Sequence, residues 1–302
     1  MPTSVAELTL GPVLYHWPAE RLRDFYFRIA DEAPVTTVHV GEVVCSKRQP
    51  FFAPHVAEVV ERLQAAGKTV VLSSLALVME GRESRAMAEL CAERELLVEA
   101  NDISAVGMLA GRPHLLGPFL NVYNEGTLAW LRDNGAIRAC LPVELPERSI
   151  GALAAVPGIA AEVMVFGRLP LALSARCYHA RAEGRRKDDC RFACGDDPDG
   201  MEVATLDGEP FLAVNGIQTM SYTCASLARQ LGGLRTLGVH HFRLSPQACD
   251  MVSVARTFRA LLDGEIEAGA AEATLGDLFP AAPLANGFLF GREGMLHLEG
   301  HA

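Results

Sequence analysis

Short apolar runs alternate with amphipathic segments along the first half of the chain. A continuously apolar run such as 69–74 is typical of a strand buried on both faces, whereas 19–30 and 54–66 carry apolar residues at helical spacing. We expect strands at 8–16, 36–44, 69–74, 96–99, 114–122, 137–145 and 162–166. The intervening segments predict helices at 19–30, 54–66, 83–93, 124–134 and 146–156, with a short one starting at Asp102. Such alternation indicates a parallel sheet.

An eighth strand is predicted at 239–244, with a helix over 248–262. Eight strand–helix units in roughly 250 residues are the size of a (β/α)8 barrel of the TIM type. An open doubly wound sheet is the alternative. We favour the α/β barrel because no glycine-rich phosphate-binding fingerprint follows the first strand.

The regular pattern is interrupted twice. An insertion at 175–238 separates strands seven and eight, and it contains a hairpin of 203–205 and 210–214 that turns at Asp207-Gly208. After about residue 264 the chain becomes rich in Ala, Gly and Pro, and we expect it to be irregular. The predicted organisation is a barrel over 1–264, including the insertion, and a tail over 265–302 that packs on the barrel.

Composition excludes several classes of protein. The chain has 302 residues and a net charge of −10, which argues against binding nucleic acid or an anionic membrane by charge. The first residues lack the basic and apolar regions of a secretory signal, and the longest apolar stretch, 69–79, is too short to span a bilayer. We therefore expect a cytoplasmic protein, in which eight cysteines are not expected to form disulfides.

Three cysteines fall in one polar loop. Cys177, Cys190 and Cys194 lie within eighteen residues that show no apolar face, so thiolate–metal bonds are the expected source of order. Cys45 follows the second strand and Cys177 follows the seventh, and parallel barrel strands end on the same face. The topology thus predicts a four-cysteine metal site, with the cationic Lys47 and Arg48 beside Cys45 offsetting its charge.

The spacing leaves the metal open. Zinc sites usually pair cysteines closely on both sides, and here only Cys190 and Cys194 are close. Four thiolates also suit an iron–sulfur cluster, which the spacing favours slightly. The remaining cysteines are isolated and are expected to be core residues: Cys91, Cys140, Cys224 and Cys249.

Polar residues near the expected strand ends are further candidates for the reactive face. We take Glu42, Asn121, Arg168 and Arg243 as candidate catalytic residues, with Tyr123, Glu144 and Ser245 in similar positions. Each could instead form a structural salt bridge or hydrogen bond across the barrel top. His179 follows Cys177 by two residues and is expected either at the surface or against a cluster.

Four sequence runs carry a family resemblance. They are GEVVCSKR (41–48), FGRLPLALSARCYHAR (166–181), NGIQTMS (215–221) and RLSPQ (243–247). With these runs the chain resembles, over essentially its whole length, the collagenase-like peptidase family of barrel proteins, in particular the iron–sulfur members that act in oxygen-independent ubiquinone biosynthesis. The resemblance implies a [4Fe-4S] cluster held by Cys45, Cys177, Cys190 and Cys194.

The resemblance also implies a function. It suggests oxygen-independent hydroxylation of the ubiquinone ring precursor by a heterodimer with a UbiU-like paralogue, assisted by a UbiT-like lipid-binding protein. Prephenate is the oxygen donor proposed for the family. Arg168, Arg176 and Arg243 would suit such a dicarboxylate by bidentate pairing.

Two alternatives remain open at this point. The chain can be a non-catalytic partner whose cluster is structural or relays electrons, or it can be a zinc-dependent hydrolase or peptidase. Family members with the general signature have a cysteine shortly after the glycine of strand seven, where this chain reads Gly167-Arg168-Leu169-Pro170. It also lacks the H-E-x-x-H and G-x-S-x-G motifs, so proteolysis is not expected.

Overall fold

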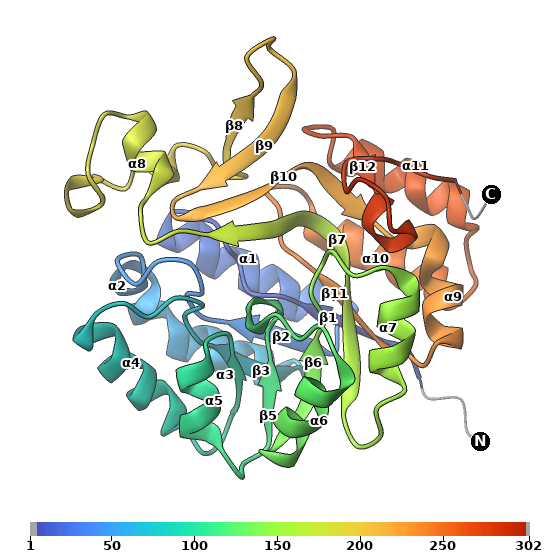
Figure 1. Ribbon diagram of the computed structural model, residues 1–302, viewed down its shortest axis with the longest axis horizontal. Coiled ribbons are helices and arrows are strands. Elements are labelled where there is room, and N and C mark those ends of the chain that lie inside the picture. Colours follow the sequence, from blue (N-terminus) through green and yellow to red (C-terminus); the bar gives the residue numbers. More distant parts are fainter. Residues whose placement is uncertain (1–4, 300–302) are drawn as a thin grey trace.

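The computed structural model describes residues 5–299, and its central feature is a closed parallel barrel (Figure 1). Each strand pairs in parallel with the next, and the last barrel strand pairs with both the seventh and the first. The barrel strands are β1 (Glu7–Leu10), β2 (Thr37–Val40), β3 (Thr69–Ser73), β4 (Leu97–Ala100), β5 (His114–Leu116), β6 (Ala136–Cys140), β7 (Ala160–Leu173) and β11 (His241–Leu244). This closure confirms the (β/α)8 architecture and rules out the open sheet.

Helices surround the barrel in chain order. They are α1 (Ala19–Glu32), the short α2 (Gln49–Phe52), α3 (Val56–Ala65), α4 (Gly81–Cys91), α5 (Ile103–Leu109), α6 (Glu125–Asp133), α7 (Glu147–Ala154), α9 (Leu231–Thr236) and α10 (Met251–Leu262). The predicted cap at Asp102 is confirmed, since its carboxylate accepts a hydrogen bond from Ser104 N at 2.8 Å.

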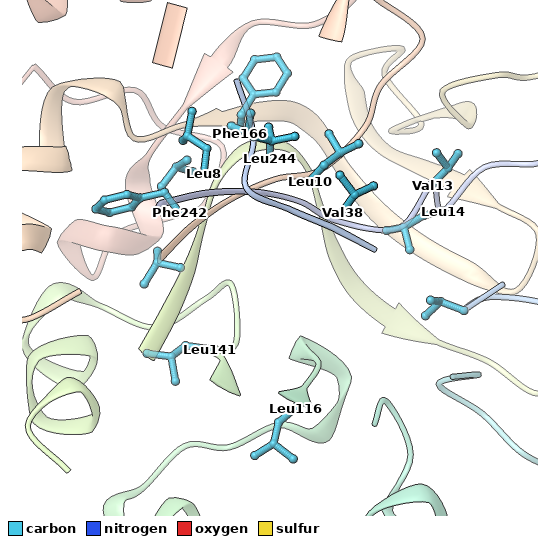
Figure 2. Packing of buried hydrophobic residues seen from close by; sticks show 14 of the residues in the cluster. Leu8, Leu10, Val13, Leu14, Val38, Leu116, Leu141, Phe166, Phe242 and Leu244 are labelled. Carbon is cyan, nitrogen blue, oxygen red and sulfur yellow. The ribbon is translucent and has the colours of Figure 1, made fainter. Parts of the chain in front are cut away.

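Strand alternation divides the barrel wall into two faces. Leu8 and Leu10 of β1 and Phe242 of β11 are fully buried beside one another (Figure 2). Arg243, the neighbour of Phe242, instead meets charged side chains from other strands inside the barrel. Apolar side chains such as these therefore fill the layer between strands and helices, and the charged groups around Arg243 lie in the barrel interior.

Most barrel strands are shorter than the apolar runs that predicted them. The runs at 36–44, 114–122 and 137–145 give strands that end at Val40, Leu116 and Cys140. The remaining apolar residues, such as Val43 and Val122, are buried in the loops above the barrel. These loops pack on the strand ends, so a loop can be as apolar as the strand before it.

The insertion forms an antiparallel arm above the barrel (Figure 1). Strand β7 continues past the barrel and pairs with β10 (Gln218–Ser226), which pairs with β9 (Pro210–Asn215) and through it with β8 (Met201–Ala204). The predicted hairpin is confirmed, with Gly208 in the turn at φ +89°. Strand β10 was not predicted.

The expectation of an irregular chain after residue 264 was wrong. Helix α11 (Ala268–Leu278) packs beside α10 and buries Ala271 and Leu275, and β12 (Leu284–Ala285) pairs with β10. Alanine is the strongest helix former, and its small side chain allows helices to pack closely. An Ala-rich segment is therefore compatible with a packed helix, and composition alone did not reveal α11. The division into barrel and tail at 264 stays a prediction.

Candidate functional site

The structure brings the four predicted cysteines to one small cavity above the barrel. Cys45 lies in the loop between β2 and α2. Cys177 precedes the short helix α8 (Tyr178–Ala182). Cys190 directly follows the single turn η3 (Lys187–Asp189), and Cys194 lies in the single turn η4 (Ala193–Gly195). Cys45 and Cys177 thus line the same cavity although they are 132 positions apart in the chain.

Local hydrogen bonds fix these cysteines in place. Glu42 Oε1 accepts from the backbone N–H groups of Val44 at 2.8 Å and Cys45 at 2.9 Å. The Cys177 sulfur accepts from Ala180 N at 3.4 Å. Arg191 and Phe192, between the last two cysteines, have φ of +47° and +55°. Two successive non-glycine residues in this conformation are strained, which indicates that the tertiary structure dictates the turn.

A buried arginine lies against the cysteines. Arg48 is 3% exposed and lines their cavity. Its Nη1 donates to Leu14 O at 2.9 Å and its Nη2 to Asn215 Oδ1 at 2.8 Å, and its guanidinium also bonds the Cys194 thiol. The β9 residue Asn215, whose Nδ2 donates to the same Leu14 carbonyl at 2.7 Å, was not predicted as a site residue.

Burial and this arginine act in opposite directions on the thiols. Burial raises the pKa of Cys45 and of Cys194, and the positive charge of Arg48 lowers both. Burial also raises the pKa of Cys177. All eight cysteines are free. A cationic centre bound by these cysteines as thiolates would displace their protons.

The cysteine loop is anchored by more than its cysteines, contrary to the expectation of no apolar contact. The Phe192 ring packs edge-to-face on Phe51, with centroids 4.7 Å apart, and lies 5.6 Å from His16. His179, expected either at the surface or against a cluster, is 2% exposed, lines the cysteine cavity and pairs with Asp197 at 3.0 Å. A single aromatic side chain thus supplies the apolar anchor that periodicity could not reveal.

The donor set fits an iron–sulfur cluster in its chemistry. Four thiols line one cavity with a buried cation beside them, and the buried Nδ1 of His179 has no partner among the described residues. Within residues 5–299, no group of three or more His, Cys, Asp or Glu side chains is arranged to hold a single metal ion.

A buried charge network fills the barrel interior below the mouth. Arg243 Nη2 donates to Glu99 at 2.5 Å and to Glu162 at 2.6 Å, and lies 3.3 Å from His39 Nε2. Glu99 Oε2 also accepts from Ser73 at 2.9 Å. Desolvation raises the pKa of Glu99, but the charges of Arg243 and His39 and their hydrogen bonds together outweigh it, so the pKa of this carboxyl is lowered. The sequence signal that could have found these residues is a charged or polar position inside each apolar strand.

A second small cavity opens at the barrel mouth above this network. Its lining includes Gly11, Asn101, Arg243 and Ser245. Asn101 Oδ1 and Glu162 Oε1 are buried without partners among the described residues. Arg243 and Ser245 therefore lie where the sequence placed them, but Arg243 is already neutralised by two carboxylates.

Asn121 does not end a strand. It is exposed, five residues beyond the end of β5, and has φ of +55°, which asparagine tolerates better than most residues. Tyr123 and Glu144 are also exposed, and they hydrogen-bond to each other on the rim.

Arg168 points away from the mouth. Its Nη1 donates to Ser221 O at 3.1 Å, and the guanidinium stacks on Tyr222 and Phe279. The pairing of β7 with β11 contains one extra β7 residue between Met164 and Phe166. Such a bulge reverses which face the following side chains occupy, a shift that alternation cannot foresee. Arg176 is exposed on the loop after β7.

Most of the chain is similar to one protein family and to solved structures of other proteins. Residues 17–299 match the model of peptidase family U32. A phospho-2-dehydro-3-deoxyheptonate aldolase from Thermotoga maritima is 11% identical, over 93% of this chain and 72% of that one, with a TM-score of 0.43. A protein described as a fructose-1,6-biphosphate aldolase from Coccidioides immitis is 9% identical, over 91% and 89%, with a TM-score of 0.39. No helix within residues 5–299 is long and apolar enough to cross a membrane.

Proposed function

The chain belongs to peptidase family U32, the collagenase-like family that its motifs resemble, and from this premise we propose that it is a UbiV-type iron–sulfur member rather than a protease. It acts in oxygen-independent hydroxylation of the ubiquinone ring precursor, in a UbiU–UbiV-type heterodimer with a UbiU-like paralogue. A UbiT-like lipid-binding protein assists, and prephenate is the candidate oxygen donor.

One observation carries this proposal: Cys45, Cys177, Cys190 and Cys194 line a single cavity beside the buried Arg48. Four thiolates in a pocket with one compensating cation are the donor set of a [4Fe-4S] cluster. When bound there, the cluster would supply one-electron transfer at a site above the barrel.

The protein's own residues hold and tune this site. The four cysteines supply the thiolates, and Glu42 orients the Cys45 backbone through its 2.9 Å hydrogen bond. Arg48 offsets thiolate charge and ties the cysteine loop to Leu14 and Asn215. A positive charge and N–H donors beside thiolate sulfur raise a cluster's reduction potential.

A second candidate is a non-catalytic subunit that only relays electrons or supports its partner. Two observations favour it: Arg168 is held by backbone carbonyls, and Arg243 is shared by two carboxylates. Neither arginine is then free to pair with a dicarboxylate. No observation on the described residues favours the zinc-dependent hydrolase, so it is not proposed.

The cofactor is tested by anaerobic purification, with iron, labile sulfide, absorption and paramagnetic resonance measured. Alanine variants of each of the four cysteines are expected to lose the cluster. Cys91 is a buried cysteine on α4 that does not line the cavity. The Cys91→Ala variant is therefore the matched control and is expected to keep the cluster. A colourless protein with zinc and no labile sulfide would refute the cluster.

The two functional candidates are separated in the reconstituted heterodimer. Glu42, Asn121, Arg168 and Arg243 are replaced singly, and only variants that keep the cluster spectrum are assayed for ring hydroxylation. Loss of hydroxylation in one or more variants supports a catalytic subunit. Full activity in all of them supports the relay subunit, and activity of the isolated chain would contradict the heterodimer.

A further inference from the structure

A larger cavity lies outside the barrel wall, under the helices. It has a volume of about 310 Å³ and is lined by Val40 of β2, Leu72 of β3, Leu22 of α1 and Met87 of α4. We call it the helix-side cavity. Its volume is at the low end of the roughly 300–1,000 Å³ range of small-molecule pockets. It has room for one substituted ring.

Most polar groups in the lining are already engaged. The Tyr15 hydroxyl donates to Gln247 Oε1 at 3.0 Å and that of Tyr26 to His39 O at 3.1 Å. Ser73 Oγ donates to Glu99 at 2.9 Å. These residues therefore present ring and methylene surfaces to the cavity, which makes its wall largely apolar and partly aromatic.

Two charged residues keep hydrogen-bonding capacity. Glu42 lines the cavity, and its two described hydrogen bonds both go to Oε1. Arg48 lines it too; the side chain is 3% exposed, and its Nε is buried without a partner among the described residues. The exposed Gln49 also lines the cavity and adds an amide. The cavity thus combines a largely apolar wall with one charged acceptor and one charged donor, whose charges cancel.

This combination selects a ligand class. A hydrocarbon would leave the buried Nε–H unpaired, which is unfavourable. A carboxylate would be attracted by Arg48 but repelled by Glu42. A neutral hydroxyl satisfies both, because it can donate to the Glu42 carboxylate and accept from the Arg48 N–H.

We propose that the helix-side cavity binds a small neutral phenol, with its ring against Leu72 and Met87 and its hydroxyl toward Glu42 and Arg48. Arg48 lines both this cavity and the cysteine cavity, so the bound ring lies one side chain from the four thiols. The inference rests on the proposed function in taking a phenol as the substrate class of ring hydroxylation. Binding itself does not require the cluster.

The probe is 4-ethylphenol, with ethylbenzene as its match lacking the hydroxyl. Binding is followed by NMR of the full chain, labelled at the methyl groups of its nine methionines. The resonances of Met87 and Met164 are assigned through Met→Leu variants. Met87 reports on the helix-side cavity, whereas Met164 lines the cavity at the barrel mouth. The expected result is saturable shifts at Met87 with Met164 unchanged, and at least fivefold weaker binding of ethylbenzene.

Two variants of helix α4 provide the matched comparison. Ala86→Leu fills the cavity from its lining and is expected to weaken 4-ethylphenol binding at least tenfold. Ala88→Leu adds the same volume on the exposed face of α4 and is expected to leave binding unchanged. Glu42→Gln is expected to weaken the phenol severalfold and ethylbenzene hardly at all.

Shifts at Met164 alone, no saturable shift at Met87 in the folded wild type, or undiminished binding by Ala86→Leu would each overturn the proposal. If Ala86→Leu does not fold, the presence or absence of saturable Met87 shifts in the wild type still decides the test. All titrations are run on cluster-loaded and cluster-free protein. Absence of iron and sulfide with intact phenol binding refutes the proposed function alone, and a normal cluster without binding refutes the cavity assignment alone.

Discussion

Glu42 Oε1 accepts a hydrogen bond from the backbone N–H of Cys45 at 2.9 Å. A carboxylate three residues before a candidate ligand thus fixes the peptide that carries the ligand. The same oxygen accepts from Val44 N at 2.8 Å. Glu42, chosen from the sequence as a candidate catalytic residue, is therefore first of all a positioning residue for the β2–α2 loop.

This relationship predicts different outcomes for two Glu42 substitutions. Glu42→Ala leaves two backbone donors without an acceptor, at a cost of about 1–3 kcal/mol, and is expected to lower iron content after anaerobic reconstitution severalfold. Glu42→Gln keeps an acceptor oxygen and is expected to retain at least half of the wild-type iron. Equal iron content in the Ala and Gln variants would show that the hydrogen bond does not position Cys45.

Arg48 is expected to matter far more than its neighbour Lys47. Arg48→Met leaves Asn215 Oδ1 without its donor and removes one of the two donors to Leu14 O, at a cost of about 1–3 kcal/mol, and it removes the cation beside the thiols. Lys47 is 22% exposed and bonds mainly to Lys187 O at 2.7 Å, so Lys47→Met is expected to cost less than about 1 kcal/mol.

The measurements for the Arg48 and Lys47 variants are urea unfolding and the cluster's reduction potential. Loss of the buried cation is expected to shift the potential to more negative values in Arg48→Met. A matching shift in Lys47→Met would mean that general charge, rather than the buried guanidinium, sets the potential.

The ring contacts of Phe192 are expected to limit protease cleavage of the cysteine loop. Phe192→Ala removes the ring contacts with Phe51 and His16, a loss of about 1 kcal/mol. Opening of the loop becomes about fivefold more frequent, and trypsin cleavage within 185–187 is expected to accelerate accordingly. Leu206→Ala, at the fully exposed hairpin tip, is the control and is expected to leave the cleavage rate unchanged.

The same assay tests whether the cluster orders the loop. Cluster-free wild type is expected to be cleaved faster than loaded protein, because the thiols then lose their common centre. Equal rates in the two forms would indicate that Phe192 and the polar anchors suffice.

The barrel interior predicts a pH dependence of stability. Desolvation raises the pKa of Glu99, but Arg243 and His39 outweigh it, so its folded pKa lies below the ordinary 4.5. Between these values the unfolded chain binds the proton more readily, so stability rises with pH there. The contribution of Glu99 is complete above pH 4.5 and is lost as pH falls further.

Urea unfolding between pH 3 and 7 measures this contribution in cluster-free protein. Wild type is expected to lose stability below pH 4.5 more steeply than Glu99→Gln. At pH 7 the variant is expected to be less stable by about 3 kcal/mol, because it breaks a buried ion pair. Parallel pH profiles would assign the acid sensitivity to other carboxylates.

The amino-acid pattern by itself determined the barrel and the cysteine set. Eight apolar strands separated by amphipathic helices predict a parallel sheet covered by helices. The absence of a glycine-rich fingerprint after the first strand then favoured the closed barrel over an open doubly wound sheet. The polar loop with Cys177, Cys190 and Cys194 was visible because cysteines without an apolar face need another reason to be there. Cys45 followed from topology, since parallel strands end on one side.

Only the tertiary structure decided which charged residues act together. One extra residue in β7 turns Arg168 away from the mouth, although Arg243 on the adjacent strand stays inside it. Glu99, Glu162 and His39 meet Arg243 from three other strands, and Arg48 meets Asn215 across 167 positions. These pairings depend on the register of the strands and on the exclusion of water from the buried charges. Both are properties of the assembled sheet and cannot be read from any local run of residues.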